Sequence, residues 1–184
     1  MKIINSGLTH DFNGDLKGKK VEKSQKLYKA AKGFYKSVDE SLSEDTVMYE
    51  VTTVNAEKQE AGYLNWGISL LHPVTVNGEC CMTRGHYHEN LNCEEYYWCA
   101  DGEGLLMLMD EEGKSWCEKM CKGTLHHING HHAHRLVNTG ESDLRVICCW
   151  NSDAGHDYDR VEKHPFPFRV FKKNGGIVIE DAER

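Results

Sequence analysis

The sequence predicts an all-β fold. From Ser41 onward, short runs rich in Val, Ile, Thr, Tyr and Trp recur at regular intervals, separated by pairs of Gly, Asn and Asp residues. Short strands at this spacing are typical of a sandwich or barrel of antiparallel strands. The chain has 184 residues and contains neither a repeat nor a low-complexity linker, so no domain boundary is expected within its β-rich part.

The first 40 residues differ from the rest of the chain. Apolar residues such as Val21 and Leu27 recur at near-helical spacing among lysines, which predicts helix within residues 20–40. We therefore expect a partly helical N-terminal extension, residues 1–40, followed by a single domain, residues 41–184.

Nine strands and a C-terminal hairpin are expected after the extension. The first run, Val47–Val54, consists largely of β-branched and aromatic residues, which favour extended structure. Asn77-Gly78 and Asn174-Gly175-Gly176 are turn signals of the kind that joins antiparallel strands. The expected strands are residues 47–54, 63–71, 79–83, 95–100, 104–109, 115–120, 124–128, 134–138 and 144–150, and the hairpin covers residues 168–179.

The charge pattern argues against a nucleic-acid or membrane partner. The net charge is −7, and no run approaches the roughly 20 apolar residues needed to cross a bilayer. Residues 1–40 hold nine lysines and five acidic residues but no arginine, which favours solvated surface over a nucleic-acid site. The segment Met1–Asp11 lacks the apolar stretch of an export signal, so a cytoplasmic location is expected.

The eight cysteines predict reduced thiols rather than disulfides. All lie between Cys80 and Cys149, and two pairs are sequence neighbours, which rarely bond to each other. No Cys-x-x-Cys pair is present for a zinc or redox centre. The cysteines are therefore interpreted as small apolar side chains.

A metal-ligand set is the most informative feature of the chain. His86 and His88 alternate with Tyr87, so in extended backbone both imidazoles project to the same side. Glu95 lies on the next expected strand, and His134 begins a later one. Mixed imidazole and carboxylate ligands suit a divalent first-row metal, and an incomplete protein ligand set leaves positions open for chemistry.

The choice of His134 among the later histidines rests on its context. The run Ala133-His134-Arg135-Leu136-Val137-Asn138 predicts a strand that holds the imidazole rigidly. Four neighbours near a Gly/Asn turn are expected to support the site or face solvent: His126, His127, His131 and His132. The alternative is a histidine-rich loop that binds metals adventitiously.

These motifs resemble the cupin superfamily, whose double-stranded β-helix, or jelly-roll barrel, carries metal ligands on two short motifs. The six-residue gap from His88 to Glu95 is longer than usual, and it matches the cupin-type glucose-6-phosphate isomerases. Family phrases are found in Thr83–His88, Glu95–Tyr97 and Ala133–Asn138. The most diagnostic is Asp153-Ala154-Gly155-His156-Asp157-Tyr158, which ordinary cupins lack.

The resemblance implies roles for individual residues. It assigns His86, His88, Glu95 and His134 to the metal, and a sugar-phosphate pocket to Tyr49, Ser69, Thr83, Gly85, Tyr97, His156 and Tyr158. Trp150 occupies a position where the family often has tyrosine, so a phosphate contact there must change because indole offers one N–H donor and no acceptor. The family also implies a homodimer and a single divalent ion, with Fe²⁺ favoured and Mn²⁺, Ni²⁺ or Zn²⁺ as alternatives.

Isomerisation of an aldose to a ketose moves a proton between C1 and C2 through a cis-enediol. Glu95 is the candidate base, as the only carboxylate of the set, and His156 is the candidate for opening the sugar ring. A hydride shift is the competing mechanism. Arg84 or Arg135 adds positive charge at the phosphate, unless both are surface ion-pair partners. Two other functions use the same ligands: a cupin dioxygenase or decarboxylase, and a sugar-binding cupin without turnover.

Overall fold

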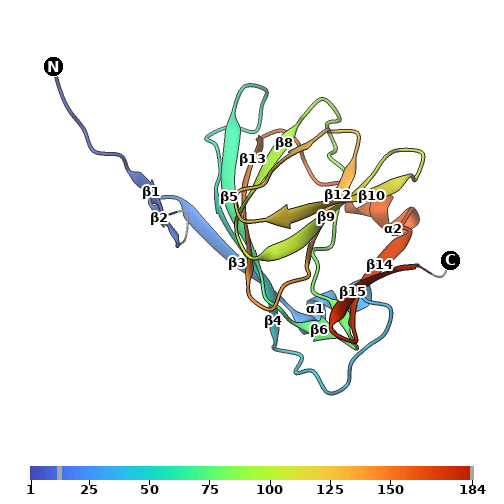
Figure 1. Cartoon of the computed structure of the whole chain (residues 1–184). Coiled ribbons are helices and arrows are strands. Elements are labelled where there is room, and N and C mark those ends of the chain that lie inside the picture. Colours follow the sequence, from blue (N-terminus) through green and yellow to red (C-terminus); the bar gives the residue numbers. More distant parts are fainter. Residues whose placement is uncertain (12–13, 183–184) are drawn as a thin grey trace.

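The chain folds around a six-stranded antiparallel sheet with strand order β11-β8-β13-β5-β4-β3 (Figure 1). The computed structural model describes residues 1–11 and 14–182. The strands of this sheet are β3 (Val21–Leu27), β4 (Val47–Val54), β5 (Leu64–Leu71), β8 (Glu95–Asp101), β11 (Leu125–Ile128) and β13 (Leu144–Asn151).

A three-stranded antiparallel sheet contributes the second layer of the barrel. It has the order β10-β9-β12 and consists of β9 (Glu103–Met109), β10 (Ser115–Cys121) and β12 (Ala133–Asn138). The segment before β8 runs antiparallel to β12, because Met82 bridges Val137 and His86 bridges His134. Side chains from both sheets join one buried cluster that includes Leu71, Leu106 and Leu144.

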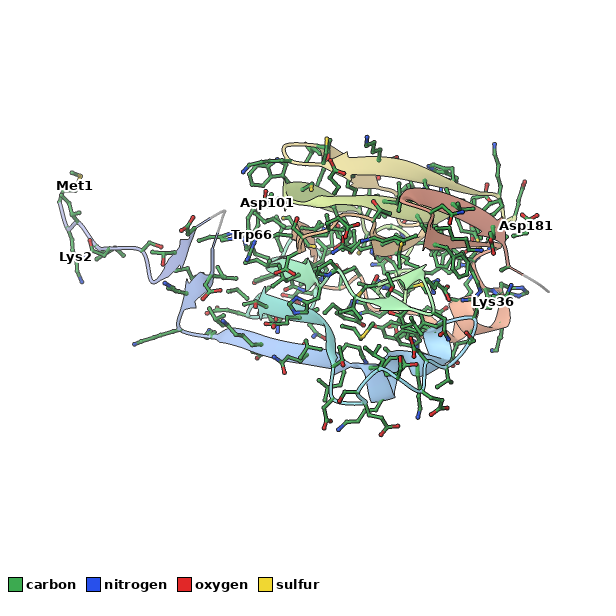
Figure 2. The ribbon with its side chains drawn as sticks, turned by 60° about the horizontal axis from the view of Figure 1, so that its bottom comes forward. Met1, Lys2, Lys36, Trp66, Asp101 and Asp181 are labelled. Carbon is green, nitrogen blue, oxygen red and sulfur yellow. The ribbon has the colours of Figure 1, made fainter. Side chains whose placement is uncertain are left out.

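Smaller elements flank these sheets. A four-stranded sheet contains β6 (Thr75–Val76), β7 (Glu79–Cys80), β14 (Phe168–Lys173) and β15 (Gly176–Asp181), and the helices are α1 (Tyr28–Ala31), the 3-10 turn η1 (Lys32–Phe34) and α2 (Tyr158–Lys163). A separate hairpin of β1 (Leu8–His10) and β2 (Leu16–Gly18) belongs to an arm that extends away from the body and ends at Met1 (Figure 2). In the described ranges, no helix has the length and apolar character that crossing a membrane requires.

Two hairpins follow directly from the turn signals in the sequence. Asn77 and Gly78 join β6 to β7 with φ values of 48° and 83°. Asn174 and Gly175 join β14 to β15 with φ values of 52° and 77°. Positive φ at both central residues matches the right-handed twist of the flanking strands, and asparagine and glycine adopt it at little cost.

The all-β prediction and the double-stranded β-helix are confirmed. The helix expected within residues 20–40 is wrong for most of its length, because β3 pairs with β4 in register from Val21↔Val54 to Leu27↔Val47. Only α1 and η1 are helical there. Cross-strand hydrogen bonds at the edge of the sheet outweigh a weak helical periodicity in a short, lysine-rich segment. The division into residues 1–40 and 41–184 stays a prediction.

Candidate active site

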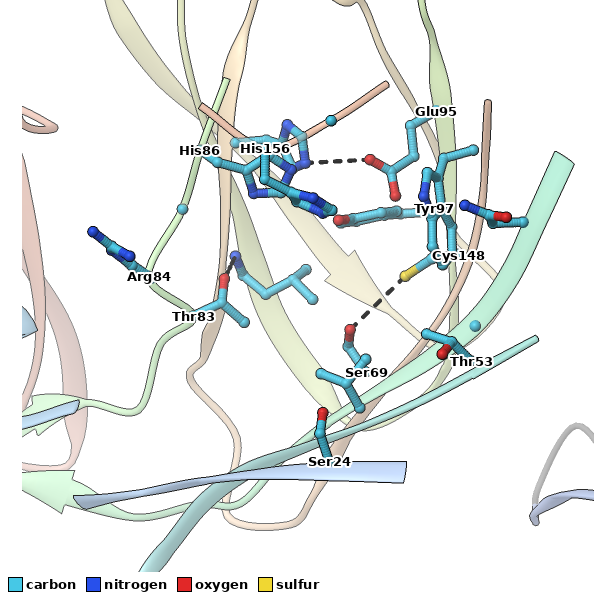
Figure 3. Close-up of a pocket in the computed structure, with 18 of the residues that line it drawn as sticks. Ser24, Thr53, Ser69, Thr83, Arg84, His86, Glu95, Tyr97, Cys148 and His156 are labelled. Atoms are coloured by element: carbon cyan, nitrogen blue, oxygen red, sulfur yellow. Dashed lines mark hydrogen bonds and ion pairs between the residues drawn. The ribbon is translucent and has the colours of Figure 1, made fainter. Parts of the chain in front are cut away.

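A cavity of about 680 Å³ opens between the strands of the barrel. Its walls come from β3, β4, β5, β8, β12 and β13, together with residues 83–86 and the loop 152–158. Figure 3 shows Glu95 and Tyr97 near His86 and His156 at one end, with Ser69 and Ser24 toward the other. The cavity therefore has an imidazole and carboxylate end and a hydroxyl end.

The four residues of the expected ligand set lie together at the first end. His86, His88, Glu95 and His134 each offer one ligand atom, and these atoms all lie within 4.8 Å of one another. His88, Glu95 and His134 are buried, with 2%, 5% and 2% of their surface exposed. Three separate segments therefore bring ligand atoms to one buried point.

Backbone pairing places two of these histidines. The N–H of His134 donates to the carbonyl of His86 at 3.0 Å, and the N–H of His86 donates to the carbonyl of His134 at 3.3 Å. Gly85 precedes this bridge with φ of 80°, and a Cβ there would lie 2.9 Å from the Phe166 ring and 3.2 Å from the carbonyl of His134. Glycine is required at this position because both the conformation and the close approach exclude a larger residue.

The hydrogen bonds of the histidines suit a metal ion. Nδ1 of His88 lies 2.8 Å from the carbonyl of Cys93, and Nδ1 of His134 lies 3.5 Å from the carbonyl of His132. A carbonyl accepts a hydrogen bond from Nδ1–H, which leaves the Nε2 lone pair directed at the site. Nε2 of His134 is buried without a hydrogen bond, although it lies 3.2 Å from Oε2 of Glu95. The donor set therefore fits a divalent cation.

The electrostatics favour the metal-binding protonation states of His86 and Glu95, whereas the interactions of His88 with Glu95 outweigh burial and raise its pKa. Burial, followed by the charges of His134, His156 and His88, lowers the pKa of His86 well below its ordinary value, so the imidazole is neutral. Burial raises the pKa of Glu95, but its interactions with His134 and His88 outweigh burial and lower the pKa overall. Glu95 is therefore an ionised carboxylate, with Oε2 3.3 Å from Nε2 of His88.

His156 and Tyr158 stack beside this group. Their ring planes differ by 10° with centroids 5.7 Å apart, and the His156 ring lies 4.4 Å from that of His86. Asp157, between them, caps α2 by accepting a hydrogen bond from the N–H of Arg160 at 3.0 Å. Burial lowers the pKa of His156, so its imidazole is neutral near pH 7 and able to accept a proton.

Tyr97 and Cys148 cover the side of the cavity next to Glu95. Burial and the Glu95 carboxylate raise the pKa of Tyr97 well above its usual value, so the phenol stays protonated and remains a hydrogen-bond donor. The Cys148 thiol lies 3.9 Å from the hydroxyl of Ser69. Burial raises the pKa of Cys148 well above that of an ordinary thiol, which leaves it neutral.

The structure brings the other predicted pocket residues to the same cavity. The Thr83 hydroxyl oxygen accepts from the N–H of Leu136 at 3.0 Å, which leaves its own O–H available. Trp150 packs over Gly67, where a Cβ would lie 3.1 Å from the indole. Of the predicted site residues all but His88 line the cavity: Tyr49, Ser69, Thr83, Gly85, His86, Glu95, Tyr97, His134, Trp150, His156 and Tyr158.

Sequence reasoning missed several residues of the wall. Lys26, interpreted as solvated surface, is half-buried and lines the cavity from β3, as does Ser24. Gln25 between them lines the cavity as well, so no alternating pattern in the sequence indicates this contact. Cys148, expected to be a small apolar side chain, also lines the cavity, and nothing in its sequence context indicates this position.

The neighbouring histidines lie outside the four-residue group. His126 and His127 are in β11 rather than in a turn, and they pair with Glu118 and Glu94 at 2.6 Å and 2.8 Å. Similarly, His131 pairs with Glu111 at 2.8 Å, and His132 packs edge-on against Trp116. These contacts account for the four residues as surface and supporting side chains.

The two arginines considered for the phosphate have different positions. Arg84 lines the cavity, pairs with Glu162 and lies 4.4 Å over the Tyr158 ring. Arg135 points away from the cavity and stacks over Phe166 at 4.7 Å. Of the two arginines, Arg84 is therefore the one placed to add positive charge to the cavity.

Comparison with known proteins agrees with this geometry. The family described as Glucose-6-phosphate isomerase (GPI) matches residues 18–181, most of the chain. The chain belongs to that family. Its members are aldose–ketose isomerases, so membership places the chain among enzymes.

Individual members of the isomerase family align over much of their length. The chain is 33% identical to the glucose-6-phosphate isomerase of Pyrococcus abyssi over 183 residues, covering 97% of this chain and 95% of the relative. It is 35% identical to the glucose-6-phosphate isomerase of Thermococcus litoralis, covering 74% of this chain and 72% of the relative. Among solved structures, an oxalate oxidase is 12% identical with a TM-score of 0.48, covering 60% of this chain and 56% of that one.

Proposed function

We propose that the chain interconverts glucose 6-phosphate and fructose 6-phosphate through a cis-enediol, with a divalent metal ion bound by His86, His88, Glu95 and His134. The observation that supports this proposal is the convergence of four ligand side chains at one end of a cavity in a member of the isomerase family. When bound, the cation supplies positive charge that stabilises negative charge developing on substrate oxygens.

Glu95 is proposed as the base that carries the proton between C1 and C2. It is ionised, faces the cavity and is the only carboxylate of the ligand group. Tyr97 remains protonated beside it and donates a hydrogen bond, which holds the carboxylate in one orientation. A buried, oriented carboxylate is suited to proton transfer between adjacent carbons.

His156 and Tyr158 are proposed to act on the closed sugar ring. The neutral imidazole of His156 accepts a proton from the substrate hydroxyl at C1 and returns one to the ring oxygen. Its stacking on Tyr158 and its contact with His86 fix the ring plane. Ring opening therefore takes place next to the point where Glu95 moves its proton.

The phosphate is proposed to lie at the hydroxyl end of the cavity. The hydroxyls of Ser69 and Thr83 and the N–H of Gly85 donate hydrogen bonds, while Arg84 adds positive charge. Tyr49 and Trp150 complete the wall, and burial raises the pKa of Tyr49 to about 12, which keeps its phenol a donor. Neutral donors thus bind most of the phosphate in an otherwise acidic chain.

A coupled assay on fructose 6-phosphate tests the proposal. Chelated protein is expected to be inactive, and activity is expected to return on loading Fe²⁺, Mn²⁺, Ni²⁺ or Zn²⁺, with Fe²⁺ proposed as the native ion. Absence of turnover with every metal, in protein shown to bind one, would exclude the isomerase and favour an oxygen-using or purely binding cupin.

Solvent exchange separates the two mechanisms of hydrogen transfer. In D₂O, proton transfer through Glu95 is expected to introduce deuterium at C1 or C2 of the recovered sugar phosphate. Complete retention of the original hydrogen would instead indicate a hydride shift. We further propose that the enzyme acts in glycolysis and gluconeogenesis, in the cytoplasm, as a homodimer.

A further inference from the structure

A second, smaller cavity lies next to the substrate cavity. It measures about 210 Å³ and lies among η1, α2 and β14. Three arginines contribute to its lining, namely Arg84, Arg135 and Arg169, together with the apolar side chains of Phe34, Phe166 and Phe168. With the carboxylate of Glu162 as the only acidic side chain among the described residues of its lining, this cavity carries a net positive charge.

Two of the three arginines have a carboxylate partner. Arg169 pairs with Oε1 of the buried Glu79 at 2.8 Å, and Arg84 pairs with Glu162 at the surface. Within residues 1–11 and 14–182, Arg135 forms no ion pair: it donates to the sulfur of Met82 at 3.2 Å and to the carbonyl of Arg84 at 2.5 Å. Its Nε is buried without a partner.

The position of Arg135 is unfavourable for an isolated cation. Burial, followed by the charge of Arg169, lowers its pKa to about 10, so the guanidinium is still charged near pH 7. Stacking over Phe166 offsets part of the lost hydration. A buried cation with an unused donor is stabilised most by an anion that accepts a charge-assisted hydrogen bond.

We propose that this second cavity binds a small phosphate-like oxyanion between Arg135 and Arg84. The volume suffices for such a group, and the polar side chains of the lining are the three guanidinium groups and the Glu162 carboxylate, which pairs with Arg84. Because Arg84 also lines the substrate cavity and lies over Tyr158, one side chain connects the two cavities. In Figure 3, Arg84 stands at the side of the site opposite Glu95 and Tyr97.

Titration calorimetry with inorganic phosphate tests this site in the full chain. Arg135→Met keeps an unbranched apolar stem and removes the cation. Gly33→Glu places a carboxylate at the cavity wall, where an added Cβ meets nothing within 4 Å. It provides a second test of the site if Arg135→Met folds poorly. Arg160→Met is the charge-matched control, since Arg160 pairs with Glu111 and does not line the cavity. Ser69→Ala weakens phosphate binding in the substrate cavity.

We expect phosphate binding to weaken roughly tenfold or more in both Arg135→Met and Gly33→Glu, and to persist in Arg160→Met and Ser69→Ala. If Ser69→Ala loses phosphate binding and Arg135→Met retains it, the anion binds in the substrate cavity only, and the proposal is overturned. Equal loss in Arg160→Met, or no binding by the unmodified chain, would overturn it as well. These readouts use binding alone, so they are independent of isomerase activity.

Discussion

Two regions of the barrel interior differ in what they bury. In the apolar core, Leu71, Leu106 and Leu144 are fully buried, and burial of such side chains stabilises the fold by about 1.5–3 kcal/mol each. In the candidate active site, Glu95 and His134 are buried nearly as deeply, and burial of ionisable groups costs free energy. The apolar core therefore contributes stability and the candidate site the proposed chemistry, so substitutions should separate the two.

The largest expected effect is on Glu95. Glu95→Gln removes the proposed base and a ligand atom, so kcat is expected to fall by roughly 10³-fold in the isomerase assay. Glu94→Gln is the matched control, because the carboxylate of Glu94 is adjacent in sequence but pairs with His127 at the surface. Comparable losses in the two variants would show that general charge, rather than the buried carboxylate, matters.

Leu106 tests the contribution of the apolar core to stability. Leu106→Ala leaves a cavity in the core and is expected to lower the free energy of unfolding by about 3 kcal/mol, measured by urea denaturation. Activity per folded molecule should be unchanged. Leu125→Ala, at a side chain 64% exposed, is expected to cost less than about 0.5 kcal/mol. A loss of kcat in folded Leu106→Ala would break the proposed separation.

His156 tests whether opening of the sugar ring takes place in the candidate active site. His156→Ala is expected to slow enzyme-catalysed exchange between the α and β anomers of glucose 6-phosphate by about 10²-fold, measured by exchange NMR. The exposed His164 provides the control His164→Ala. If anomer exchange continues at its normal rate while isomerisation falls, His156 acts at another step.

Ser69 tests the hydroxyl end, where neutral donors predict a graded effect. Ser69→Ala is expected to raise KM by roughly tenfold with little change in kcat, because one hydrogen bond to a charged phosphate contributes about 1.5 kcal/mol or more. Ser69→Thr retains the hydroxyl and should restore KM. A fall in kcat without a change in KM would place Ser69 at the reacting carbons instead.

The smallest effect is the pH dependence of the core thiols. Burial raises the pKa of Cys81 to about 12, above the value near 9 of an exposed thiol, and its Sγ donates to the carbonyl of Met48 at 3.1 Å. Between these values the unfolded chain loses the proton first, so the contribution to stability is complete below pH 9 and declines as the pH rises toward 12. The melting temperature of Cys81→Ser should decline less steeply with pH across this range than that of the unmodified chain. An unchanged slope would show that the Cys81 thiol does not cause the pH dependence.

Much of the fold and of the site was predictable from local sequence. Strand β4 has the predicted bounds, and the Asn77-Gly78 and Asn174-Gly175 turns lie where expected, because backbone preferences of adjacent residues decide them. The alternation of His86 and His88 correctly indicated a common direction for both side chains. The metal ligands and pocket roles themselves stay predictions, which the proposed assays test.

What the sequence by itself determined is most of the strands after residue 46, their turns and the residue types of the candidate site, because these depend on contacts between near neighbours. The tertiary structure alone decided that residues 21–27 form an edge strand, which brings Lys26 to the cavity, and that Arg135 turns away from it. Both outcomes depend on partners far along the chain, β4 for the strand and Phe166 for the arginine. Hydrogen bonding and packing between residues so far apart in the chain depend on the whole fold, so no local sequence pattern predicts them.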